Sequence, residues 1–103
     1  MLNNLFEILK KEENFFSIKL ASGKHEIFQA HFPNNPLLPA FMMMEICSKV
    51  LKQEIIAIEK AKFIHPVFPQ DLLEFFIKEN GQRVSIKILK DTKKVAEILY
   101  EKK

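Results

Sequence analysis

Two residues fourteen positions apart, His31 and Glu45, have side chains that could work as an acid–base pair. Histidine exchanges a proton near neutral pH, so His31 could serve as a base. Glu45 lies in a segment, 40–52, that is apolar at most positions. A buried glutamate needs a partner group or a water-filled cavity, because an unpaired buried carboxylate is costly. Burial would favour the protonated form of Glu45, which is the form that a general acid requires.

A stiff loop and a helix are expected to position this pair. Residues 31–39 contain three prolines, which remove backbone donors and disfavour helix in the preceding residue. Residues 40–52 contain neither glycine nor proline, and their apolar side chains go nearly all the way round a helical wheel. A helix that is apolar on almost every side is a buried one. Pro39 suits the first turn of this helix.

The other segments are predicted mainly as strands. The apolar spacing of residues 2–11 is close to helical, which predicts a short N-terminal helix. Residues 15–20 alternate as in a strand, and 25–29 is expected to be a second short extended piece. Four further strands are expected at 54–64, 72–79, 83–90 and 94–100, with turns at 80–81 and 91–92. The simplest packing is an α+β fold in which an antiparallel sheet wraps around one apolar helix.

Length and composition restrict the protein class. The 103 residues suit a single domain, 1–103, and 48% of them are hydrophobic, including ten Phe. Some of this apolar surface is expected to face a partner subunit or an apolar ligand. The net charge of +3 comes without a basic stripe bearing aromatic residues, which argues against nucleic acid and suits an acidic protein partner. No apolar run reaches the length of a membrane span, and a cytoplasmic location is expected.

Other chemically active residues have plainer interpretations. His25 and His65 show no metal-ligand spacing with each other or with Cys47, so neither a metal site nor another cofactor is predicted. The single cysteine excludes an intramolecular disulfide and is expected to be a buried, inert thiol. Met42, Met43 and Met44 are expected to fill the core, although methionine also adapts well to flexible acyl chains.

Two motifs in this chain resemble the 3-hydroxyacyl-[acyl-carrier-protein] dehydratases, which have the hotdog fold. The segment His31-Phe32-Pro33, with Pro36, Pro39 and Glu45, is similar to the family pattern His-Phe-Pro-Gly-x-Pro-x-x-Pro-Gly followed, after four residues, by Glu or Asp. Residues 61–71 are similar to its Ala-x-Phe-x-x-Pro-Val-x-Pro-Gly-Asp pattern. The resemblance implies a hotdog fold, with the sheet wrapped around one long apolar central helix.

The resemblance also implies a reaction, the residues that perform it and their partners. His31 would remove the C2 proton of a 3-hydroxyacyl thioester, and Glu45 would protonate the leaving C3 hydroxyl. The backbone N–H of Ala40 would meet the thioester oxygen. Phe32, Pro39, Phe41 and Met44 would contact the substrate. The acyl chain would arrive on the phosphopantetheine arm of an acidic acyl-carrier protein, at sites shared across a homodimer or a trimer of dimers.

Around the first motif, the chain departs from the family at three glycines, whose positions hold Ala30, Asn34 and Ala40. The Ala40 methyl lies where the thioester should pass, which bears on turnover and on substrate length. Two alternatives to a dehydratase therefore stay open. One is a non-catalytic hotdog module that binds acyl-carrier proteins or pairs with an active subunit. The other is a hotdog thioesterase, although those enzymes generally lack the His-Phe-Pro loop.

Overall fold

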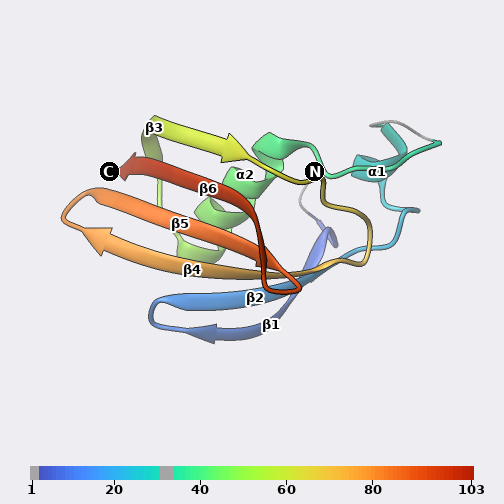
Figure 1. The fold of residues 1–103 in the computed structure, drawn as a ribbon, viewed down its shortest axis with the longest axis horizontal. Helices are drawn as coiled ribbons and strands as arrows, with labels where there is room; N and C mark the ends of the chain where they lie inside the picture. Colours follow the sequence, from blue (N-terminus) through green and yellow to red (C-terminus); the bar gives the residue numbers. More distant parts are fainter. Residues whose placement is uncertain (1–2, 31–33) are drawn as a thin grey trace.

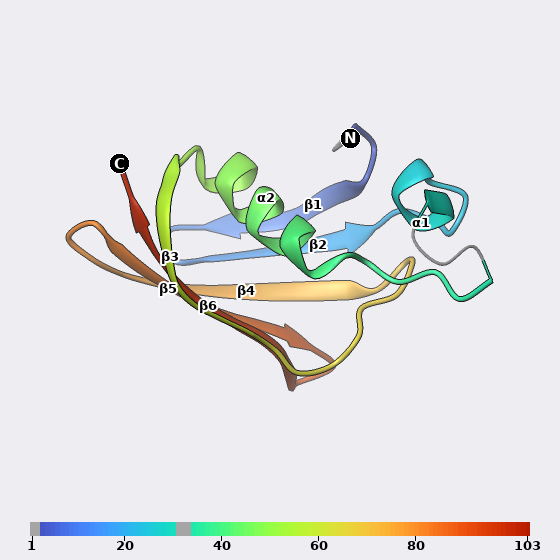
Figure 2. The ribbon, with the colours of Figure 1, turned by 90° about the horizontal axis from the view of Figure 1, so that it is seen from above.

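The computed structural model describes residues 3–30 and 34–103, which form one antiparallel sheet and two helices (Figure 1). The elements along the chain are β1 (Phe6–Glu12), β2 (Phe15–Leu20), α1 (Glu26–Ala30), α2 (Ala40–Leu51), β3 (Ile55–Phe63), β4 (Leu72–Asn80), β5 (Arg83–Lys90) and β6 (Lys93–Lys102). The order across the sheet is β1-β2-β4-β5-β6-β3, so β1 and β3 are its edges. Figure 2 shows α2 lying against one face of the curved sheet.

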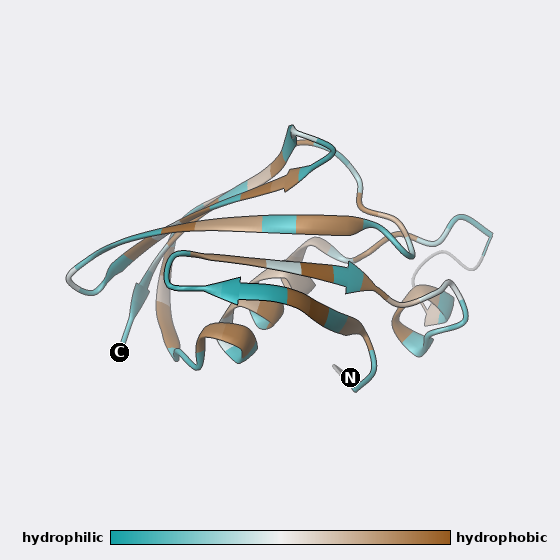
Figure 3. Cartoon of the chain, turned by 90° about the horizontal axis from the view of Figure 1, so that it is seen from below, coloured by the Kyte–Doolittle hydropathy of each residue, from teal (hydrophilic) through white to brown (hydrophobic). Residues whose placement is uncertain are grey.

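Alternating side chains of the inner strands form the core against α2. Phe16 and Phe75, paired across β2 and β4, stack with ring centroids 4.3 Å apart. Successive strand residues point to opposite faces, so every second residue of these strands enters the core. Figure 3 shows the hydrophobic colour along α2 and the central strands, and the hydrophilic colour on the second half of β1. The buried residues of α2 are Met42, Met43, Ile46, Cys47 and Val50.

A chain of hydrogen bonds fixes the C-terminal end of α2 to the sheet. Lys52 adopts a left-handed conformation that ends the helix, with its N–H bonded to the Ser48 carbonyl. The buried Tyr100 hydroxyl donates to Gln53 Oε1 at 2.6 Å, and Gln53 Nε2 donates to Glu79 Oε1 at 2.7 Å. A hydrogen bond from Lys102 lowers the pKa of the Glu79 carboxyl group. Desolvation by burial raises the pKa of Tyr100, so its hydroxyl stays a donor.

Five predicted elements, the strands at 15–20, 54–64, 72–79, 83–90 and 94–100, are confirmed with small changes at their ends. The predicted N-terminal helix is wrong, because Phe6–Glu12 forms edge strand β1 paired with β2. The extended piece predicted at 25–29 is also wrong, because Glu26–Ala30 is a short helix. The His25 side chain caps the N-terminus of this helix, because its Nδ1 accepts the Ile27 N–H at 3.1 Å.

The long apolar central helix implied by the resemblance is not confirmed, since α2 has only 12 residues. Pro39 precedes it with extended backbone torsions, and Lys52 ends it. The expectation that α2 is buried on every side is also wrong for a single chain. Phe41, Glu45 and Lys49, spaced four apart, are all exposed, so one face of the helix is open.

Candidate functional site

The two sequence motifs meet at the beginning of α2. The buried Leu38 N–H, at the end of the proline-rich loop, donates to the carbonyl of buried Val67 at 2.8 Å. Leu38 belongs to the first motif and Val67 to the second, so this bond joins segments that lie far apart in the sequence. Figure 1 shows the loop that follows β3 passing beside the segment that enters α2. The end of the first motif is therefore fixed against the second before the helix begins.

The second motif ends in a tight turn stabilised by Asp71. Its Oδ2 accepts the Phe68 N–H at 2.7 Å and pairs with Lys90 Nζ at 2.8 Å. Lys90 also lies 4.8 Å from the centre of the Phe68 ring. Gln70 has a positive φ of 66° at the position where the family pattern has glycine. The conformation of the turn is thus kept although the glycine is absent.

The N-terminal end of α2 supplies backbone donors. Ala40 is the first helical residue, and Pro39 precedes it without a side-chain cap. The first N–H groups of an α-helix have no partner within the helix, and the helix dipole makes this end positive. These groups suit a developing negative charge on an oxygen atom. Whether the Ala40 N–H meets a thioester oxygen stays a prediction.

Glu45 lies on the exposed face of α2, at the side of a surface pocket of about 390 Å³. The predicted buried environment of Glu45 is therefore wrong for a single chain. The sequence pattern shows how many apolar residues lie round the helix. It does not show that α2 packs against the sheet with only one side, and the predicted burial of Glu45 is wrong for that reason. The pocket residues are Phe41, Met44, Glu45, Ser48, Glu54, Ile55 and Ile58.

Three predicted site residues thus come together in this pocket. Phe41, which is 55% exposed, and half-buried Met44 lie in the same pocket as Glu45. Pro39 and Ala40 lie at the start of the helix and are half-buried. His31 and Phe32 lie outside the described residues. The approach of His31 to Glu45 therefore stays a prediction.

Sequence reasoning missed the contribution of β3 to this pocket. Ile55 and Ile58 lie on β3, and Glu54 immediately precedes it. The strand alternation of 54–64 was visible, but that pattern does not reveal which strand is an edge beside the helix. Within residues 3–30 and 34–103, no group of three His, Cys, Asp or Glu side chains could hold a metal ion. In the same ranges, no helix is long and apolar enough to span a membrane.

The sequence of this chain matches a family of known proteins. The ApeI-like family, described as ApeI dehydratase, matches residues 8–98 of this chain. The 3-hydroxyacyl-[acyl-carrier-protein] dehydratase FabZ of Rhizobium etli is 31% identical over 99 residues, and the match covers 84% of this chain. It covers 63% of the Rhizobium protein, so the chain spans less than two thirds of that relative.

Solved structures show the same fold. The dehydratase heterocomplex ApeI:P from Xenorhabdus doucetiae aligns with a TM-score of 0.69 at 20% identity, covering 93% of each chain. A mutant of the fluoroacetyl-CoA-specific thioesterase FlK aligns with a TM-score of 0.55 at 10% identity, covering 90% of this chain and 87% of that one. Dehydratases and thioesterases share this architecture, so the fold alone does not decide the reaction.

The sheet wrapped against one helix is the hotdog fold. The chain belongs to the ApeI-like dehydratase family. The resemblance seen in the sequence is thereby confirmed.

Proposed function

We propose that this protein is a hydro-lyase that converts (3R)-3-hydroxyacyl thioesters, carried on an acyl-carrier protein, into trans-2-enoyl thioesters in fatty acid or related acyl-chain synthesis. The observation that carries this proposal is the family match over residues 8–98, which includes the His31-to-Glu45 motif. A cytoplasmic location is part of the proposal. The relative in Rhizobium etli is named for the same type of substrate.

In the proposed reaction, His31 takes the proton from C2 while Glu45 gives a proton to the C3 hydroxyl. The C3–O bond breaks, water leaves, and the electron pair from the C2–H bond forms the C2=C3 double bond. Negative charge gathers on the thioester oxygen, where backbone donors at the start of α2 would stabilise it. The exposed apolar side chains of Phe41 and Ile58, beside Glu45, suit an acyl chain.

A second hotdog chain is needed to cover Glu45, and the β3 edge supports such an interface. Among residues 3–30 and 34–103, β3 pairs only with β6, and every residue of β3 after Ile55 is exposed. Ile56 and Ile58 are each 52% exposed on this strand. An exposed apolar edge strand is a template for pairing with another chain. We propose a homodimer joined along β3, with each site completed across the interface, because a two-fold contact uses the same edge of both chains.

An Ile58→Asp variant is expected to be monomeric, because pairing would place an unpaired carboxylate in an apolar interface. Leu72→Asp is the matched control. Leu72 is exposed to almost the same extent, 53% against 52%, but it lies on β4, which is an interior strand of the sheet and not an edge. Light scattering after size-exclusion chromatography would measure the mass of each variant. A dimeric Ile58→Asp protein, or loss of dimerisation in both variants, would contradict the β3 interface.

The activity is tested with the purified full chain and a panel of 3-hydroxyacyl chains on an acyl-carrier protein. Mass spectrometry of the carrier is expected to show loss of one water, with no such loss above background for His31→Ala. Release of free carrier thiol without an enoyl product would instead identify a thioesterase. No product from the chain alone would overturn the proposal that it is a self-sufficient dehydratase.

A second candidate function is favoured by the heterocomplex and by the missing glycines. The Xenorhabdus structure is titled as a dehydratase heterocomplex, and this chain has Ala30, Asn34 and Ala40 where the family pattern has glycine. This chain could then serve as a non-catalytic module that binds acyl-carrier proteins or supports an active subunit. In that case, activity would appear only when a second hotdog chain is added, and His31→Ala in this chain would leave it unchanged.

A further inference from the structure

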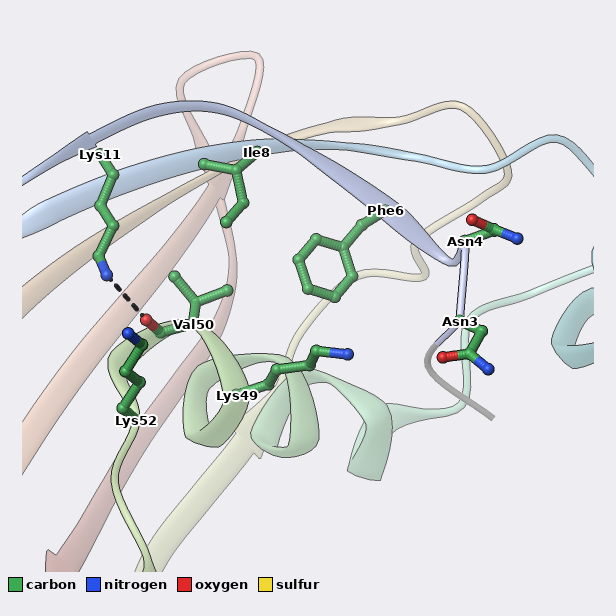
Figure 4. A pocket seen from close by; sticks show the side chains of 8 residues that line it. All are labelled: Asn3, Asn4, Phe6, Ile8, Lys11, Lys49, Val50 and Lys52. Carbon is green, nitrogen blue, oxygen red and sulfur yellow. Dashed lines mark hydrogen bonds between the residues drawn. The ribbon is translucent and has the colours of Figure 1, made fainter.

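A second groove lies on the β1 side of α2, away from the pocket of Glu45. It has a volume of about 610 Å³, within the usual range for small-molecule sites. Its walls come from β1, the segment before β1, and the C-terminal end of α2 (Figure 4). The groove shares no residue with the pocket of Glu45. Its residues are Asn3, Asn4, Phe6, Ile8, Lys11, Lys49, Val50 and Lys52.

The groove combines an apolar wall with three ammonium groups. Figure 4 shows Phe6 and Ile8 projecting from β1 towards α2. Lys11 donates to the Val50 carbonyl at 3.0 Å, and this bond to a neutral acceptor leaves its charge uncompensated. Within the described parts of the chain, Lys11, Lys49 and Lys52 form no ion pair with a carboxylate.

The helix dipole explains only part of this positive charge. The C-terminal end of a helix carries roughly half a negative charge, which favours a nearby cation. Three full positive charges exceed this half negative charge. Nearby glutamates could also neutralise exposed lysines, but among residues 3–30 and 34–103 none pairs with these three. Elsewhere in the described ranges, seven of the thirteen lysine and arginine side chains have carboxylate partners, whereas none of these three has one. The charges around the groove therefore complement an anion.

The apolar wall favours a small ligand over a protein segment. Ile8 is 47% exposed, but Phe6 is half-buried and Val50 is only 4% exposed. A docked amphipathic helix requires several apolar anchors over two turns, and a stable protein interface requires a larger area. One aliphatic chain with one anionic head matches both the limited apolar surface and the charge.

We propose that this groove binds a medium-chain aliphatic carboxylate, with its chain against Phe6 and Ile8 and its head group near Lys49 and Lys52. This site is separate from the proposed catalytic pocket and does not rest on the proposed reaction. Decanoate is the probe, and titration calorimetry of the full chain at low ionic strength gives its affinity. Decylammonium, with the same chain and the opposite charge, and acetate, the head group alone, are each expected to bind at least about tenfold more weakly.

Paired variants locate the site. Ile8→Asp places a carboxylate in the groove and is expected to abolish decanoate binding, whereas Leu9→Asp is expected to retain it. Leu9 is the neighbouring residue, is exposed to a similar extent, 49% against 47%, and does not line the groove. If Ile8→Asp fails to fold, Lys49→Gln and Lys52→Gln decide instead, each expected to weaken binding roughly threefold to fivefold.

Several results would overturn this assignment. Equal binding of decanoate and decylammonium would show that the lysines do not contribute to the affinity. Equal loss of binding in the two aspartate variants would show that β1 rather than the groove is responsible. Loss of decanoate binding in Phe41→Asp, which adds a carboxylate to the pocket of Glu45, would place the ligand in that pocket. Retained binding in Phe41→Asp, with loss in Ile8→Asp, supports the groove whether or not the chain is a dehydratase.

Discussion

Glu45→Gln is expected to lower the rate of enoyl formation by roughly 10²- to 10⁴-fold, the usual contribution of one acid–base group. Glutamine keeps the size and polarity of the side chain but cannot give a proton to the leaving hydroxyl. Because Glu45 is exposed in a single chain, the substitution is expected to leave the fold intact. The rate is measured on carrier-bound 3-hydroxyacyl chains, with thermal unfolding of the variant as a check.

Glu54→Gln is the matched control, because Glu54 lines the same pocket and undergoes the same change of charge. Glu54 pairs only loosely with Lys103, at 3.7 Å, and both side chains are exposed, so its loss has little structural effect. The rate of this variant is expected to stay within about twofold of the parent protein. Equal losses in the two variants would point to the overall charge of the pocket and would remove Glu45 from the role of acid.

The inner strands of the sheet could be predicted because their pattern is local. Residues 83–88 alternate strictly, and Val84, Ile86 and Ile88 are fully buried as that alternation requires. The edges of the sheet could not be predicted in the same way. In residues 2–11 the apolar spacing suits a helix, but pairing with β2 overrides it, and β1 buries little apolar surface of its own.

The candidate site could be predicted in its residues but not in its surroundings. The motif located Glu45 on a helix and the backbone donors at the helix start, because both depend on spacing along the chain. The solvent exposure of Glu45 depends on what covers α2, and no periodicity in one chain contains that information. The sequence argument that Glu45 must be buried is satisfied only if another chain covers Glu45 and its pocket, as proposed.

Phe75→Ala is expected to destabilise the protein by about 3–5 kcal/mol, the usual cost of removing a buried ring from a close-packed core. Phe75 is fully buried, and its ring stacks on Phe16 at an interplanar angle of 13°, so the truncation leaves a cavity in the layer between β4 and α2. A loss of this size would lower the melting temperature by roughly 12 °C or more. A loss of about 3–5 kcal/mol is a large part of the roughly 5–15 kcal/mol by which a domain of ordinary size is stable.

The next residue provides the control for this prediction. Phe76 is 43% exposed on the opposite face of the same strand and contacts Phe15 at 5.0 Å between ring centroids. Phe76→Ala is expected to cost about 1 kcal/mol, because it removes one aromatic contact and creates no cavity. Both variants are unfolded by urea at matched protein concentrations, since dimerisation would add a concentration-dependent stability. Similar losses in the two variants would mean that the outer face of β4 is also covered, and that the core is not confined to the α2 side of the sheet.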